Sequence, residues 1–140
     1  HRYLIVRSAW VYGIGRDFVS TVLNAAADPT CPWLAVPTDR FASPTSADDL
    51  TAAVEQLIDH DTLGIYHIVC QGRCSRYDFA QAILKAAHME DKLELHPIRA
   101  ADAGSTPSYT VLDNLMLRLD NLPQPRPWKE ALNEYINSLQ

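Results

Sequence analysis

The chain has 140 residues, of which 47% are hydrophobic and 21% charged, and its formal net charge is −5. This length suits one domain with an ordinary hydrophobic core. An acidic chain without a basic stripe is not typical of nucleic-acid-binding proteins, so we expect no nucleic-acid partner. No apolar run approaches the ~20 residues of a membrane span, and no signal peptide is visible. Three cysteines argue against a disulfide framework, and we expect a reducing, cytoplasmic compartment.

The chain opens with a predicted strand over Tyr3–Arg7, and a second strand is predicted over Ile65–Val69. Both runs are apolar throughout, which is typical of strands covered on both faces. A strand this close to the first residue, with no element before it, suggests that its neighbours lie on a further segment. Between the two strands we expect a helix over Asp17–Ala27, a short strand over Trp33–Val36 and a helix opening at Thr45–Asp49.

The second half of the chain is expected to contain three helices and one strand. Ser75 and Asp78 resemble a capping box at the start of a third helix. An alternating strand is predicted over Leu93–Ile98, a loop over 99–107, and helices over Leu112–Leu119 and Trp128–Leu139. The alternation of strands and helices favours an α/β fold in a single domain over residues 1–140.

Gly13 and Gly15 follow a strand and precede a helix, with Asp39 about 20 residues on, which imitates a dinucleotide-binding fingerprint. We reject this interpretation because Phe18 occupies the position of the third small residue and would hold helix and strand apart. The first glycine also comes several residues after the strand has ended. A flexible loop before a helix explains the pattern better.

Other catalytic signatures are missing from the sequence. No tyrosine is followed four residues later by a lysine, the pair that passes a proton to a carbonyl in short-chain reductases. The spacing of Cys70 and Cys74 is atypical for zinc, and small buried cysteines explain it better. We therefore expect no catalytic residue, no cofactor-binding residue and no metal site on this chain.

Two features remain as candidates for binding. Ser8, Trp10 and Tyr12 follow the first strand, and ligands of open α/β sheets bind at the carboxyl ends of strands. The segment 39–45 carries a charge pair and hydroxyls into a helix N-terminus, a natural place for an anionic group. Packing aromatics in the first case, and a loop with an ordinary cap in the second, are the alternatives.

Taken together in chain order, these segments resemble the C-terminal half of dTDP-4-dehydrorhamnose reductases. These proteins are extended short-chain dehydrogenases/reductases that are also described as sugar-nucleotide-binding proteins. The resemblance covers essentially the whole chain and rests on the runs R-S-A-W-V-Y-G, D-R-F-A-S-P-T-S-A-D-D-L, G-I-Y-H-I-V, C-S-R-Y-D-F-A, P-S-Y-T-V-L-D-N and P-W-K-E-A-L.

The resemblance implies a Rossmann-like fold without the N-terminal dinucleotide-binding core. In the family, an upstream part supplies the Gly-rich cofactor site and the Tyr/Lys pair. The reaction it implies is hydride transfer from NADPH or NADH to the 4-keto group of dTDP-4-dehydro-L-rhamnose, giving dTDP-L-rhamnose. We expect this chain to be a fragment that binds the dTDP-sugar, holds no cofactor by itself and is inactive alone.

The resemblance also assigns a set of substrate-binding residues. Trp10 would lie against the sugar, and Val11, Tyr12 and Phe18 would line the approach to it. Three further residues would belong to the loop that closes the site, namely Asp39, Pro44 and Thr45.

This sequence departs from the family pattern at three positions. Arg40 replaces a common Gln, Ala42 a common Gly, and Thr106 stands where the family usually has Arg before Pro107. An Arg at that position would suit a diphosphate as a planar, permanently charged fork. The substrate could therefore differ from the usual dTDP-sugar.

Two alternatives follow from the same observations. The chain could be a non-catalytic binding or regulatory module of this fold, like the β subunit of methionine adenosyltransferase. It could also be a domain that associates through exposed sheet edges, which makes a homo-oligomer a possible partner state.

Overall fold

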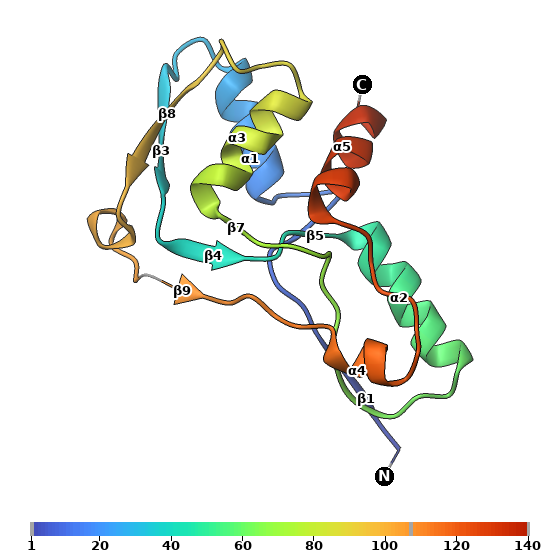
Figure 1. The fold of residues 1–140 in the computed structure, drawn as a ribbon. Helices are drawn as coiled ribbons and strands as arrows, with labels where there is room; N and C mark the ends of the chain where they lie inside the picture. Colours follow the sequence, from blue (N-terminus) through green and yellow to red (C-terminus); the bar gives the residue numbers. More distant parts are fainter. Residues whose placement is uncertain (1, 107, 140) are drawn as a thin grey trace.

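A computed structural model describes residues 2–106 and 108–139 of the chain. Figure 1 shows two lobes, which we define by their hydrophobic clusters. The large lobe contains α1, α3, α5 and the β3/β8 pair, whereas the small lobe contains α2, α4 and the β1/β6 pair. Among the described residues, no helix combines the length and hydropathy needed to cross a membrane.

The helices and strands alternate along the chain and confirm the α/β class. The helices are α1 (Phe18–Ala27), α2 (Ala47–Asp59), α3 (Arg76–Ala86), α4 (Leu115–Leu119) and α5 (Trp128–Ser138), with a 3-10 turn over Ala100–Ala103. The strands are β1 (Leu4–Arg7), β2 (Val11–Tyr12), β3 (Trp33–Pro37), β4 (Arg40–Ala42), β5 (Thr45–Ser46), β6 (Gly64–His67), β7 (Cys74–Ser75), β8 (Glu94–Ile98) and β9 (Ser108–Tyr109).

The large lobe is a parallel strand pair with helices on one face. β3 and β8 pair from Trp33↔Glu94 to Pro37↔Ile98, and α3 packs against β3 and α1. Phe79 lies within this cluster and is buried. Its ring contacts the rings of Trp10, Tyr12, Phe18 and Trp128 at centroid distances of 5.8 to 6.2 Å. Aromatic packing therefore joins α3 both to α5 and to the segment that follows β1.

The small lobe covers only one face of its strand pair. β1 and β6 run parallel, and Leu4, Val6 and Tyr66 pack into the cluster formed with α2 and α4. On the opposite face Ile5 is 44% exposed and Ile65 is 42% exposed. The expectation that both strands are buried on both faces is therefore wrong for the described residues, because helices cover one face only.

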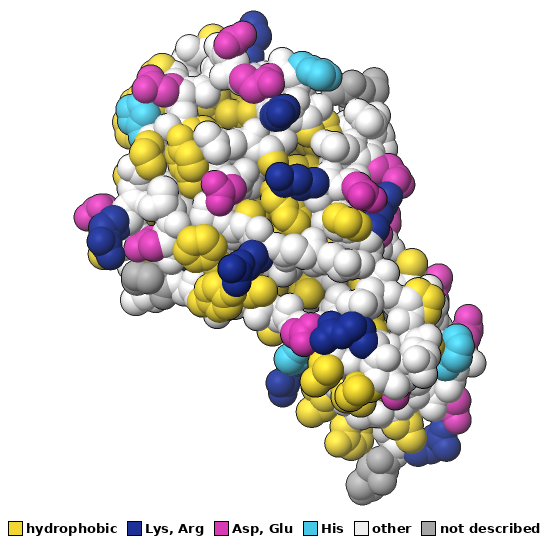
Figure 2. Space-filling view, viewed as in Figure 1, with side chains coloured by type: hydrophobic (Ala, Val, Ile, Leu, Met, Phe, Trp, Pro, Cys, Tyr) yellow, Lys and Arg dark blue, Asp and Glu magenta, His cyan; other side chains and the backbone are white. Residues whose placement is uncertain are grey.

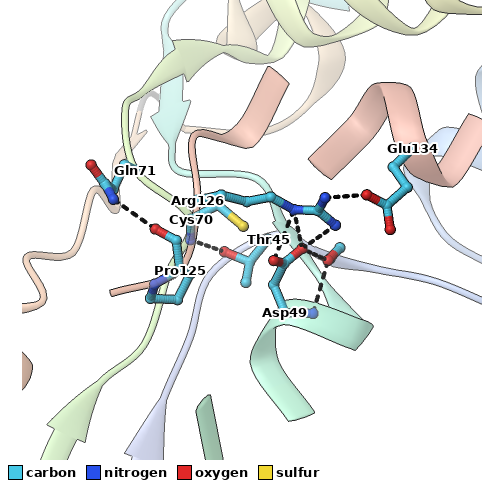
Figure 3. A network of polar contacts seen from close by, with 8 residues as sticks. Thr45, Asp49, Cys70, Gln71, Pro125, Arg126 and Glu134 are labelled. Atoms are coloured by element: carbon cyan, nitrogen blue, oxygen red, sulfur yellow. Dashed lines mark hydrogen bonds and ion pairs between the residues drawn. The ribbon is translucent and has the colours of Figure 1, made fainter. Parts of the chain in front are cut away.

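Short strands and a polar network connect the two lobes. β4 pairs antiparallel with β7 and parallel with β9, and β2 pairs parallel with β5. Arg126 donates from Nε to Asp49 in α2, at 3.0 Å from Oδ1, and from Nη1 to Glu134 in α5 (Figure 3). This arginine thus connects a helix of the small lobe to a helix of the large lobe.

Most sequence-based boundaries agree with the structure within a few residues. Asp17 caps α1 and accepts from the Ser20 amide, and the capping box of Ser75 and Asp78 opens α3 as predicted. The strands β2, β4, β5, β7 and β9 were not predicted, because each has only two or three residues.

The helix expected over Leu112–Leu119 begins later, at Leu115. The side chain of Asn114 explains the difference, because it accepts from the Val69 amide at 3.0 Å and donates to the Val69 carbonyl at 2.8 Å. These two buried hydrogen bonds hold Asn114 in a non-helical backbone conformation, so α4 begins at the next residue. The loop predicted over 99–107 contains the 3-10 turn, and its last residue, Pro107, lies outside the described residues.

Candidate functional site

The segment after β1 turns sharply at Trp10. This residue has φ of 43°, in the left-handed region that bulky side chains rarely occupy. Such a backbone costs roughly 1–3 kcal/mol and persists where the surrounding packing enforces it, often at functional sites. The Trp10 ring is half-buried and stacks on Phe79 with an interplanar angle of 19°. The predicted corner is therefore a strained turn with a fixed aromatic ring.

The guanidinium of Arg76 covers the rings of Trp10 and Phe18. Its Cζ lies 3.7 Å from the Trp10 ring centroid and 4.4 Å from the Phe18 ring centroid, which is cation–π geometry. Burial lowers the pKa of Arg76 to about 10, and repulsion from Arg40 adds to this effect. Arg76 is the first residue of α3, directly after the capping serine.

Val11 and Thr45 are brought together by the β2/β5 ladder. They are paired residues in that parallel pair, and the Thr45 amide donates to the Trp10 carbonyl at 3.2 Å. The Thr45 hydroxyl accepts from the Cys70 amide (Figure 3) and also donates to the Ser43 carbonyl at 3.1 Å. Val11 is exposed, whereas Thr45 is fully buried and its hydroxyl is engaged within the protein. Thr45 therefore stabilises the turn at Trp10 through its backbone amide, from the buried side of the turn.

Tyr12 lies inside the large lobe rather than at its surface. It is buried, its ring contacts Phe79 and Tyr135, and its hydroxyl has no hydrogen-bond partner among the described residues. Burial raises the pKa of this phenol, so it stays protonated. The Ser8 hydroxyl, at the carboxyl end of β1, is likewise buried and unpartnered within the described part of the chain. Tyr12 therefore anchors the segment after Trp10 by packing into the core of the large lobe.

The predicted closing loop is divided between two places. Pro44 is buried next to Thr45 in the β2/β5 region. Asp39 lies before β4, where its Oδ1 accepts from the Ala100 amide at 2.8 Å and its Oδ2 lies 3.8 Å from Arg99 Nε. The structure thus brings together Trp10, Val11, Tyr12, Phe18, Pro44 and Thr45, whereas Asp39 holds the 3-10 turn.

Two clefts lie near this cluster without including the predicted residues. One, of about 600 Å³, lies at the carboxyl end of β6 and is lined by Cys70, Gly72, Arg73 and Asn114 among others. The other, of about 770 Å³, lies between α3 and α5. We favour the Trp10 cluster as the candidate site, because it combines backbone strain, an aromatic surface and an arginine that pairs with no carboxylate in the part of the chain that the structure describes.

The glycines after β2 do not fit a nicotinamide cofactor. A Cβ at Gly13 would meet the Ala47 Cβ at 2.9 Å, so this glycine allows a close approach to α2 rather than to a ligand. Its amide donates to Asp17 and its carbonyl accepts from Tyr135. A dinucleotide cradle needs free amides at this turn. No group of three or more metal-ligating side chains occurs among residues 2–106 and 108–139.

Phe79 and Arg76 belong to the site and were not predicted from the sequence. Phe79 lies on the buried side of α3, and its contact with Trp10 joins residues 69 positions apart, so no local pattern indicated it. For Arg76 a signal existed, since a cation in the first turn of a helix opposes the helix dipole. A residue that is unfavourable for the local structure in which it lies often marks a functional position.

The whole chain, residues 1–140, matches the family described as RmlD substrate binding domain. It is 38% identical over 134 residues to the spore coat polysaccharide biosynthesis protein SpsK of Bacillus subtilis. The aligned region covers 94% of this chain and 46% of that relative.

Two crystal structures of dTDP-4-dehydrorhamnose reductases superpose closely on this fold. The enzyme from Clostridium acetobutylicum is 39% identical with a TM-score of 0.91, over 99% of this chain and 49% of that chain. The enzyme from Bacillus anthracis, in complex with NADP, is 30% identical with a TM-score of 0.92, over 100% of this chain and 49% of that chain. The chain spans about half the length of the relatives it matches. It belongs to the RmlD substrate-binding domain family.

Proposed function

We propose that this chain is the sugar-nucleotide-binding portion of a dTDP-4-dehydrorhamnose reductase. The whole protein would reduce the 4-keto group of dTDP-4-dehydro-L-rhamnose with NADPH and release dTDP-L-rhamnose. The observation that carries the proposal is the Trp10–Phe18–Arg76 cluster, located in a chain whose family is named for substrate binding. NADPH is favoured over NADH because a related reductase was solved with NADP.

The cluster has the chemistry that a sugar nucleotide requires. Exposed parts of aromatic side chains offer apolar area to the C–H groups of a pyranose ring, and rigid aromatics lose little entropy on binding. The strained turn at Trp10 holds the ring in place before the ligand arrives, and such preorganisation lowers the cost of association. Arg76 adds a permanent positive charge beside that ring, which suits the anionic part of the ligand.

The hydride and the proton must come from groups outside the described residues. No Tyr/Lys pair at the required spacing exists in the sequence, and the Gly13 turn does not fit a dinucleotide. We therefore expect no NADPH oxidation by this chain alone when dTDP-4-dehydrorhamnose is supplied. The function assigned to the chain is to bind and orient the sugar nucleotide.

Replacing Trp10 tests this assignment. Trp10→Ala removes the ring beneath Arg76 and should weaken binding of dTDP-rhamnose at least tenfold, measured by isothermal titration calorimetry. Trp33→Ala is the matched control, because Trp33 is 51% exposed and stacks on His96 at the start of β3, outside the Trp10 cluster. Equal losses in the two variants, or none in either, would show that Trp10 only packs and would overturn the assignment.

The alternative of a non-catalytic module receives no support from the relatives described above. Two of them are named as reductases and the third as a polysaccharide biosynthesis protein. Association with a second copy of the chain stays a prediction, which light scattering would test.

A further inference from the structure

We infer that Arg40 and Arg76 together hold the diphosphate group of the sugar nucleotide, beside the ring of Trp10. This inference rests on the proposed function, because it names the part of that ligand which the cluster recognises. It goes beyond the family resemblance, because the resemblance assigns no binding role to Arg40 or Arg76.

The β4/β7 ladder brings the two arginines close together. The strands pair antiparallel with Ala42↔Cys74 and Phe41↔Ser75 as partners, so Arg40 directly precedes and Arg76 directly follows the last paired residues. Repulsion from Arg40 contributes to the lowered pKa of Arg76. Two like charges held this close cost stability unless an anion lies between them.

Neither guanidinium is neutralised within the described residues. Arg76 makes no ion pair and no hydrogen bond there, and Arg40 makes one long contact, from Nε to Ser108 Oγ at 3.4 Å. By contrast, Arg118 and Arg126 each form hydrogen-bonded pairs with carboxylates. The donors of Arg40 and Arg76 are therefore available to a ligand that carries negative charge, and a guanidinium can donate several of them in one plane.

The nearby acidic groups are engaged elsewhere. Asp78 accepts from the amide and the hydroxyl of Ser75 in the capping box of α3. Asp39, directly before Arg40, accepts from the Ala100 amide with Oδ1, and its Oδ2 lies 3.8 Å from Arg99 Nε. Within the described residues neither carboxylate forms an ion pair with Arg40 or Arg76, so a ligand anion can bind the two guanidinium groups. A diphosphate matches them well, because each guanidinium can donate two parallel hydrogen bonds to phosphate oxygens.

The test measures how each part of the ligand contributes. The wild-type chain and the variants Arg40→Gln, Arg76→Met and Arg76→Lys are titrated calorimetrically with dTDP-rhamnose, dTDP, inorganic pyrophosphate and thymidine. Arg2→Gln serves as the control, since Arg2 pairs with Asp61 in the small lobe. Circular dichroism verifies the fold of each variant, and Arg76→Lys keeps the charge if Arg76→Met unfolds.

We expect Arg40→Gln and Arg76→Met to weaken dTDP-rhamnose and dTDP binding about tenfold or more, since charge-assisted hydrogen bonds are lost. Thymidine affinity should not change, and added salt should weaken wild-type binding more than variant binding. Tight nucleotide binding that both variants retain would overturn the inference and leave the proposed function intact. Binding of pyrophosphate but no nucleotide would support the anion site and contradict the proposed function, whereas no binding of any probe would contradict both.

Discussion

The large and the small lobe bury their apolar side chains to different extents. In the large lobe, α1, α3 and α5 enclose a continuous aromatic and aliphatic cluster around Phe79. In the small lobe, α2 and α4 cover one face of β1/β6, and Ile5 and Ile65 are exposed on the other. Figure 2 shows hydrophobic side chains on the visible surface of both lobes.

This difference shows that an apolar strand pattern predicts burial, but that burial also depends on which elements cover the strand. The apolar runs at β1 and β6 indicate strands that need cover on two faces. The described residues provide cover on one face only. Substitutions in the large lobe should therefore cost much stability in this chain, and substitutions on the open face of β1/β6 should cost little.

The largest effect is expected for Phe79→Ala in the large lobe. This change removes the ring that contacts four other aromatic side chains and leaves a cavity. Aromatic-to-alanine changes in cores cost roughly 3–5 kcal/mol of unfolding free energy. Urea denaturation followed by circular dichroism measures the loss, and a loss below about 1 kcal/mol would show that the cluster is loosely packed.

A smaller effect is expected for Arg126→Met, between the lobes. The variant leaves Asp49, whose side chain is 13% exposed, without its cation. An unpaired carboxylate at this depth should cost about 1–3 kcal/mol of unfolding free energy. Urea denaturation measures the loss, and Arg118→Met is the control, because the partner Asp113 is largely exposed. Equal losses in the two variants would mean that the network does not connect the lobes.

The same network predicts a pH dependence. The hydrogen bond from Arg126 lowers the pKa of Glu134 below its ordinary value of 4.5. A lowered folded-state pKa means that Glu134 contributes stability above pH 4.5, and that this contribution is lost as the pH falls through the folded pKa. The difference in unfolding midpoint between wild type and Glu134→Gln should therefore be present at pH 7 and shrink below pH 4.5. A difference that is constant with pH would refute the pairing.

The smallest effect is expected for Ile5→Thr on the open face of β1. Ile5 and its partner Ile65 are both exposed, and threonine keeps the β-branched shape. Surface changes of this kind usually alter the unfolding free energy by less than about 0.5 kcal/mol. Val22→Ala in α1 is the contrasting variant, because Val22 is fully buried. If Ile5→Thr cost as much as Val22→Ala in urea denaturation, the two lobes would not differ as described.

Much of the fold could be predicted because the long elements carry strong local signals. Apolar residues at helical spacing identified α1, α2 and α3, and the caps at Asp17 and Ser75 identified two helix starts. A further helix was expected over Trp128–Leu139, where α5 lies. The short strands could not be found, since two or three residues give no period and depend on partners distant in the sequence. The start of α4 was misplaced because Asn114 makes its hydrogen bonds to Val69, 45 residues away.

The candidate site was predicted only in part, for a similar reason. The sequence indicated the corner at Trp10 and its aromatic character. It could not show that Arg76 lies over Trp10 and Phe18, because those contacts join residues more than 55 positions apart. Nor could it show that Thr45 and Tyr12 face inward, since burial depends on packing across β2 and β5.

The central claim is that this chain binds a sugar nucleotide through the surface around Trp10. The most direct measurement is a tryptophan-fluorescence titration of the chain with dTDP-rhamnose and, separately, with NADPH. We expect saturable quenching by dTDP-rhamnose that is lost in Trp10→Ala, and no saturable change with NADPH. Saturable binding of NADPH without binding of dTDP-rhamnose would contradict the account.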